Sequence, residues 1–301
     1  VDDVYVFISS ISQSKEIFHG LIPELRNYDL ILNEAKTYII AKNLLLTEEP
    51  DLEKLFDDAI VEITENMDDD DFVEGYGFQM DWEDDEDNDE DEDEDEDDDE
   101  DEEGDKEEDL ELRATKLLFD SIPKYPGHEE SIERFCIPIF QKAKSRHALS
   151  YAMVLFDDRP SMTQIYASYL STFIEDKEVF SFMSLQLNEA FYSDWQKMWI
   201  IAALLQRFDA AGETIKAAYD ILSDAERHDG LRAVAAILVG KFGDYARRRR
   251  LVSIYPIVSD YIKSAIYFSS IYWGGVEKRN ARAQWGSQGV LNSLITEGMA
   301  K

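Results

Sequence analysis

The segment AALLQRF at residues 202–208 is echoed by AILVGKF at residues 236–242, and a weaker copy, SAIYF, lies at residues 264–268. Each copy begins with small residues, which allow close approach between helices, and continues into a block of bulky apolar side chains. The spacing between copies is in the range of helix-pair repeats. We therefore expect these segments to be buried helices of a repeated unit.

Helical periodicity extends outward from these copies over residues 110–301, and strand signals are nearly absent after Ile40. A helix is predicted from Leu110 to just before Pro123, and a second from Ile132 to Leu149, kinked or split at Pro138. Further helices are predicted near residues 161–175, 177–189, 192–208, 212–223, 229–241, 243–252, 255–272 and 276–297. The predicted fold class is mainly α, with a helical repeat domain that resembles HEAT-type arrays.

Residues 68–109 form an acidic tract of low complexity. The chain has a net charge of −36, of which residues 81–109 contribute −24, so the remainder carries −12. Such dense like charges repel one another and bury no apolar surface, so we predict that the tract is disordered. It is either a solvated tether or a nucleic-acid mimic that competes for a basic groove or grips a basic partner. Aromatic residues between Phe72 and Trp82 are candidates to dock the tract on a surface.

The basic signal of the chain is the run Arg247, Arg248, Arg249 and Arg250. Supporting cations nearby are Lys241, Lys263, Lys278, Arg279 and Arg282, and seven tyrosines and tryptophans interleave with them: Tyr245, Tyr255, Tyr261, Tyr267, Tyr272, Trp273 and Trp285. Four arginines in one helical turn point around the whole helix, so they do not all face one ligand. Two interpretations stay open: a nucleic-acid-binding surface, whose affinity would fall steeply with salt, and a solvated face with salt bridges.

The remaining composition narrows the class of protein. The single cysteine, Cys136, excludes an internal disulfide framework and fits a reducing cytoplasm, and its apolar neighbours predict a buried, inert thiol. The histidines are scattered without partners at ligand spacing, so no zinc site is predicted. No apolar run reaches the length of a membrane span, about 18 residues.

The front of the chain, Val1 to Ile8, reads VDDVYVFI. Asp2 and Asp3 are followed at once by alternating apolar residues, which predict a buried strand. Unpaired charge is costly to bury, so an aspartate pair at such a strand suggests a bound cation. The other interpretation of the pair is a solvated turn.

The order of the first forty residues resembles the palm of reverse transcriptases. A strand after the aspartate pair is followed by an amphipathic helix at Lys15–Leu32, by LILNEAKT at residues 30–37, and by the apolar run Tyr38–Ile40. In that family a Tyr-x-Asp-Asp turn is followed by a strand, a helix and a Leu-x-Leu-Asn-x-x-Lys-Thr element. Val1 matches the x, and the tyrosine before it is missing from the chain as given.

The resemblance implies a magnesium-dependent polymerase that adds dNTPs to a DNA or RNA primer. Asp2 would be the stronger ligand of Mg²⁺ and Asp3 the supporting one, as suits oxygen ligands, and Lys36 would lie near the leaving pyrophosphate. Lys36 is otherwise an ordinary surface lysine at a strand start. The family's third aspartate, fingers and nucleotide pocket find no match here. We therefore expect the chain to be the C-terminal portion of a longer protein and to be inactive alone.

The implied domains are the end of a palm at 1–46, a thumb-like helix at 47–67, the acidic tract at 68–109 and the helical repeat domain at 110–301. A long helical extension looks most like the Abi and unknown-group reverse transcriptases of bacterial antiphage defence. Some of those enzymes make DNA without a conventional template, and many assemble, so a cytoplasmic homo-oligomer is expected. The alternative is a non-enzymatic helical-repeat scaffold whose acidic tract mimics nucleic acid.

Overall fold

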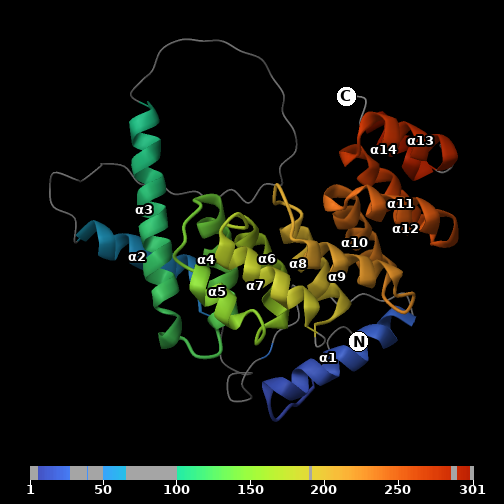
Figure 1. The fold of residues 1–301 in the computed structure, drawn as a ribbon. Coiled ribbons are helices and arrows are strands. Elements are labelled where there is room, and N and C mark those ends of the chain that lie inside the picture. Colours follow the sequence, from blue (N-terminus) through green and yellow to red (C-terminus); the bar gives the residue numbers. More distant parts are fainter. Residues whose placement is uncertain are drawn as a thin grey trace. The chain divides into compact units, whose positions relative to one another are not determined.

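The protein is described by a computed structural model, and its chain divides into two compact units. One unit comprises residues 1–38 and 148–301, and the other comprises residues 39–147. The structure describes residues 6–27, 39, 50–65, 100–189, 192–285 and 290–298 (Figure 1). All regular elements within these ranges are helical, which confirms the mainly α class. The division at His147 differs from the predicted boundary at residue 110, because the helix that begins the predicted repeat domain packs with the helix before it.

The predicted buried strand at Val4–Ile8 is not observed in its described part. Residues 6–8 have no regular secondary structure, and both Val6 and Phe7 are exposed. A strand is stabilised by hydrogen bonds to neighbouring strands, and no strand occurs in the described ranges. The prediction is therefore wrong for these residues, whereas Tyr38–Ile40 falls outside the described residues except for Ile39.

Helix α1 (Ile11–Asn27) confirms the amphipathic helix that follows, although it begins earlier than predicted. Ser10 explains the early start, because its hydroxyl accepts a hydrogen bond from the backbone N–H of Gln13 at 3.2 Å. The Gln13 side chain reaches back to the backbone N–H of Ser9 at 2.7 Å. This reciprocal arrangement resembles a capping box and fixes the helix start in the sequence itself.

The unit formed by residues 39–147 contains α2 (Leu52–Glu65), α3 (Glu100–Asp120), the 3₁₀-helix η4 (Ile122–Lys124) and α4 (Glu129–Lys142). Asp51 caps α2, because its carboxylate accepts a hydrogen bond from the backbone N–H of Lys54 at 3.1 Å. Phe56 of α2 is buried, with its ring 5.4 Å from that of Phe135. The predicted thumb-like helix is thus a packed element of this unit.

Helix α3 begins inside the acidic tract rather than at Leu110. Residues 100–109 are helical, so the prediction of disorder is wrong for this end of the tract, and residues 66–99 lie outside the described part. Among the side chains of α3 whose burial is described, Asp109 is exposed, whereas Leu110, Ala114 and Leu118 are buried. The helix therefore extends from its packed half into a segment of continuous charge.

Pro138 does not break α4, which continues through it to Lys142. The break comes later, at residues 143–148, where Lys144 adopts a positive φ of 49°. His147 closes this turn by bonding Asp120 at 2.8 Å, and its ring lies within 6 Å of those of Phe119 and Phe140. The predicted helix over 132–149 is therefore one helix at 129–142 and the start of another.

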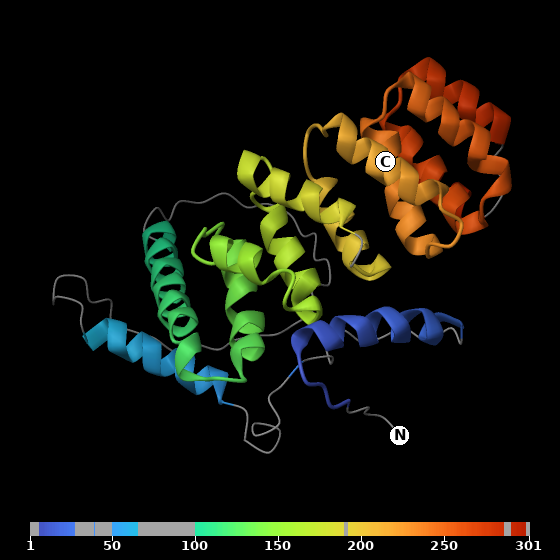
Figure 2. The ribbon, with the colours of Figure 1, turned by 60° about the horizontal axis from the view of Figure 1, so that its bottom comes forward.

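In the other unit, residues 148–301 form a series of short helices that follow one another along the chain, coloured from yellow-green to red in Figure 2. They are α5 (Leu149–Leu155), α6 (Thr163–Ser171), α7 (Lys177–Asn188), α8 (Asp194–Leu204), α9 (Gly212–Ser223), α10 (Asp229–Phe242), α11 (Tyr245–Ile254), α12 (Asp260–Ser269), α13 (Gly275–Trp285) and α14 (Val290–Gly298), with the 3₁₀-helices η5 (Pro160–Met162), η6 (Tyr255–Ile257) and η7 (Ser270–Tyr272).

These helices form an array in which each even-numbered helix contacts the next. Helix α6 packs on α8, α8 on α10 and α10 on α12, and the odd-numbered helices α7 and α9 pack beside them. The two close copies identified in the sequence, at 202–208 and 236–242, lie at the C-terminal ends of α8 and α10. Within these copies Leu204, Leu238 and Val239 are buried, as predicted, whereas Phe208 is exposed.

Hydrogen bonds tie each helix pair to the one before it, at a sequence separation close to 33 residues. At one end of the even-numbered helices, Arg207 donates to the carbonyl of Ile174 at 3.0 Å, and Trp273 donates to that of Gly240 at 3.0 Å. At the other end, Gln196 donates to Thr163 at 3.3 Å and Arg227 to Asp194 at 3.0 Å. Helix termini leave backbone groups without partners inside the helix, and here the neighbouring pair supplies partners at several of these ends.

No helix in the described ranges combines the length and apolar character needed to span a membrane.

Candidate nucleic-acid interface

The predicted catalytic residues Asp2, Asp3 and Lys36 lie outside the described residues. Within the described ranges, no group of three or more histidine, cysteine, aspartate or glutamate side chains is arranged to hold a metal ion. The sequence-predicted site that the structure does describe is the arginine run, and it is carried by α11.

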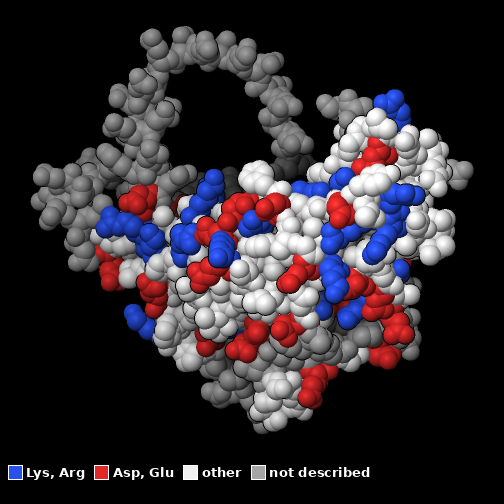
Figure 3. All heavy atoms as spheres, in the orientation of Figure 1, with Lys and Arg blue, Asp and Glu red and all other residues white. Residues whose placement is uncertain are grey.

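Local sequence fixes where α11 begins and which side faces the core. Asp244 caps the helix, its carboxylate accepting from the backbone N–H of Arg247 at 2.8 Å. Leu251 is fully buried and orients the helix. The four arginines therefore start within the first turn and spread around the helix, as their consecutive positions require. Figure 3 shows basic side chains over the C-terminal helices, with acidic side chains among them.

The first two arginines hold the local structure. Arg247 pairs with Asp244 at 3.1 Å. Arg248 is half-buried and joins two helices, because its guanidinium pairs with Glu277 of α13 at 3.1 Å and donates to the carbonyl of Gly243 at 2.9 Å. For these two residues the interpretation as salt-bridged cations describes the geometry better than a ligand-binding role.

Arg249 and Arg250 have different surroundings. Both are exposed, and no ion pair involves either of them among the described side chains. The guanidinium of Arg249 lies 6.0 Å from the ring centre of Tyr245, and that of Arg250 lies 5.3 Å from the ring centre of Tyr219. A guanidinium over an aromatic face keeps its hydrogen-bond donors available to a phosphate. These two arginines are the part of the run that is suited to bind a polyanion.

Among the supporting cations, Lys241 also makes contacts that hold the local structure. Lys241 donates to the carbonyls of Leu205 and Arg207 at 2.6 and 2.9 Å. Burial lowers the pKa of Lys241, and the charge of Glu175 opposes this shift. Lys241 is therefore a partner for the C-terminal end of α8.

Two other predicted cations also have local partners. Lys263 pairs with Asp260 at 2.9 Å. Arg282 donates to Ser270 and lies 4.6 Å from the ring centre of Tyr267. These contacts lie within α12 or between α13 and its neighbours, so they stabilise the array.

We expect replacement of Lys241 by methionine to lower the free energy of unfolding by about 2 kcal/mol, because it removes two hydrogen bonds from a charged donor. Lys263→Met is the matched control. Its ammonium pairs only with the exposed Asp260 among the described residues, and exposed pairs contribute about 0.5 kcal/mol. Urea unfolding followed by tryptophan fluorescence measures both. Equal effects of the two substitutions would show that the carbonyl contacts of Lys241 add nothing to stability.

Sequence reasoning missed the exposure of Phe208 and the contact of Tyr219 with Arg250. Phe208 follows the repeated block at residues 202–208 and is 91% exposed, although an aromatic side chain there was expected in the core. Tyr219 belongs to α9, and only the packing of α9 against α10 brings it near α11. The sequence signal that could have indicated this surface is the aromatic residue at the end of each repeated block, namely Phe208 and Phe242.

The structure confirms the prediction that the single cysteine has a buried thiol. Cys136 of α4 is fully buried, and burial, with a smaller contribution from Glu133, raises its pKa. The thiol therefore stays protonated near neutral pH and is not activated as a nucleophile.

Comparison of the chain with protein-family models, with curated proteins and with solved structures finds no match.

Proposed function

We propose that this chain is the C-terminal part of a reverse transcriptase of the antiphage-defence type, with the helical array as its nucleic-acid-binding appendage. The observation that carries the proposal is the order of Asp2-Asp3, an apolar run, an amphipathic helix and LILNEAKT at residues 30–37. The helix at 11–27 agrees with that order, whereas the lack of a strand at residues 6–8 does not support it.

In this proposal Asp2 and Asp3 hold Mg²⁺ together with a third aspartate from an earlier strand. Two carboxylates supply the hard oxygen ligands that this ion prefers. When bound, the metal favours the deprotonated primer hydroxyl and neutralises the triphosphate. Lys36 lies near the departing pyrophosphate as a cation or proton donor. The array, which we relate to HEAT-type repeats, holds primer, template or product through α11.

The experiment is a polymerisation assay on the natural full-length protein and on residues 1–301 alone. Labelled dNTPs are supplied with Mg²⁺ or with EDTA, with and without RNA and DNA templates. We expect Mg²⁺-dependent incorporation by the full-length protein and none by residues 1–301. Incorporation by residues 1–301 alone would contradict the assignment as a fragment. If the full-length protein incorporates nothing yet binds nucleic acid, the non-enzymatic scaffold replaces the polymerase.

A further inference from the structure

One end of the even-numbered helices forms a continuous edge, because its turns are bonded to one another. Arg207 reaches the carbonyl of Ile174, and Lys241 in turn reaches that of Arg207 at 2.9 Å. The ammonium of Lys241 also lies 5.6 Å from the ring centre of Tyr272. The turns that follow α6, α8, α10 and α12 are thus consecutive along the array.

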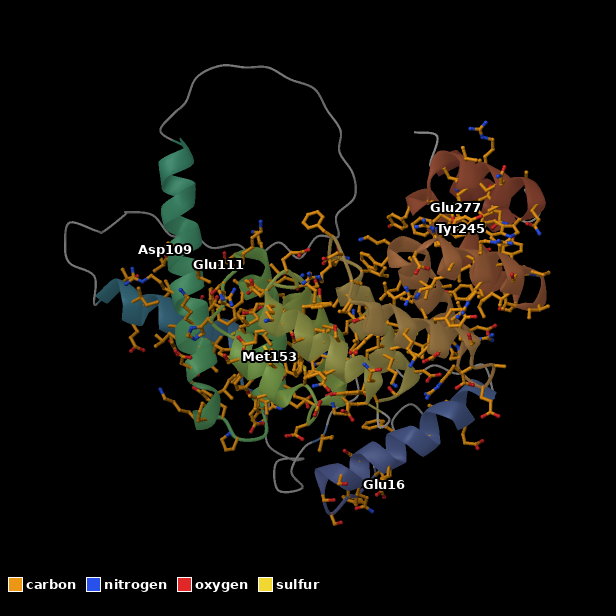
Figure 4. All side chains as sticks on the ribbon, in the orientation of Figure 1. Glu16, Asp109, Glu111, Met153, Tyr245 and Glu277 are labelled. Atoms are coloured by element: carbon orange, nitrogen blue, oxygen red, sulfur yellow. The ribbon has the colours of Figure 1, made fainter. Side chains whose placement is uncertain are left out.

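This edge exposes aromatic rings that a packed core would bury. Phe208 is 91% exposed in the turn after α8, Tyr245 is 60% exposed at the start of α11, and Tyr272 is 44% exposed after α12. Figure 4 labels Tyr245 on α11 and Glu277 on α13, helices that the pairing of Arg248 with Glu277 holds together. Single exposed aromatics are ordinary on protein surfaces. Their recurrence at equivalent turns is the feature that needs a function.

Positive charge accompanies the rings. Arg249 lies over Tyr245 and Arg250 over Tyr219, and both guanidinium groups are exposed without an ion pair among the described residues. An apolar partner would leave these charges without a counter-ion, whereas a phosphate would complement them. Arg249 therefore places a cation without an ion pair among the described residues beside the ring of Tyr245 at the edge, and Arg250 is the next residue along α11.

We propose that this edge binds single-stranded nucleic acid, with Phe208, Tyr245 and Tyr272 stacking on bases and Arg249 and Arg250 contacting phosphates. Proteins that hold single strands combine these two features, since every base has an aromatic face and the backbone is anionic. A duplex buries its base faces in the stack, so it cannot use the rings. The proposal adds a class of ligand to the proposed function. It depends on that function only for which reaction supplies the single strand.

The test measures the affinity of the whole chain for labelled nucleic acids by fluorescence anisotropy. The ligands are oligothymidylate, oligouridylate, an abasic strand of equal length and a blunt duplex. We expect Tyr245→Ala and Tyr272→Ala each to weaken binding of the base-containing strands about tenfold and to leave the abasic strand unchanged. Arg249→Ala weakens all single strands and reduces the slope of log K against log salt by about 0.7. DNA and RNA arms identify which strand is preferred.

The matched control is Tyr261→Ala. Tyr261 is 57% exposed, but it lies at the start of α12, the opposite end of the helix from Tyr272. Circular dichroism checks the folding of every variant, including Tyr272→Ala, since the ring of Tyr272 lies against that of Phe268 and the ammonium of Lys241. Equal affinity of the Tyr245→Ala and Tyr261→Ala proteins, or equally tight duplex binding, overturns the proposal. So does a fall in molar mass of Tyr245→Ala in light scattering without loss of strand binding, since the edge would then join two copies.

The two proposals fail separately. Loss of strand binding through Tyr245→Ala with synthesis intact in the full-length protein supports the edge as an accessory site. Strand binding without any synthesis supports the edge and contradicts the polymerase.

Discussion

Replacement of Gly240 by alanine is expected to lower the free energy of unfolding by about 3 kcal/mol, at the upper end of overpacking effects. Gly240 lies on α10, where a Cβ atom would meet both Oγ and Cβ of Ser269 on α12. The pair α10 and α12 makes the most extensive helix contact described in the array. Because the Cβ of Ser269 is fixed to its backbone, the two helices must separate to admit the methyl group.

Two further variants isolate this cause. Gly212→Ala introduces a methyl group that meets nothing within 4 Å at the start of α9, so it should be neutral or stabilising by up to about 1 kcal/mol. Ser269→Gly removes the atoms that Gly240→Ala would meet. In a double-mutant cycle, we expect Ser269→Gly to recover most of the loss in the Gly240→Ala protein. Additive effects in urea unfolding would show that the close approach of these helices is not the cause.

Replacement of Asp2 by asparagine in the full-length protein is expected to reduce dNTP incorporation about a thousandfold, because a metal ligand contributes several kcal/mol of transition-state stabilisation. Asparagine keeps the size of the side chain and removes its charge. Asp3→Asn should have a smaller effect, since the resemblance assigns Asp3 the supporting role. Single-turnover incorporation over a range of Mg²⁺ concentrations measures both.

The aspartate pair Asp157-Asp158 provides a control for Asp2→Asn. Asp158 is exposed at the end of α5, and Asp158→Asn should leave incorporation unchanged. Circular dichroism compares the folding of all three variants. Incorporation by Asp2→Asn within twofold of the natural protein would remove the basis for a metal centre at the front of the chain.

Much of the helical array could be predicted from apolar periodicity alone. The helix predicted at 212–223 has the same bounds in the structure, and its buried residues Ile215, Ala218 and Leu222 recur at helical spacing. The predicted helix at 255–272 is instead split into η6, α12 and η7. Ser259 caps a new helix there by accepting from the N–H of Ile262. A capping residue such as Ser259 inside an apolar pattern is the sequence signal that would have predicted this split.

The candidate interface was less predictable, because tertiary neighbours decide which charges are available. The sequence shows four equivalent arginines, but Glu277 is 29 residues away from Arg248 and takes it as a partner. Tyr219 reaches Arg250 only through the packing of neighbouring pairs. Periodicity reports which face of a helix is buried and carries no information on which distant side chain meets it.

The bonds between successive helix pairs also determine how this array responds to mechanical load. Each pair is held by contacts with its neighbours and by ties about 33 residues apart, such as Trp273 to Gly240. We expect a force applied to the C-terminal helices to break those ties sequentially, one helix pair at a time. Each event would release about 33 residues, or ~110 Å of extended chain, and single-molecule stretching would record it as a regular sawtooth.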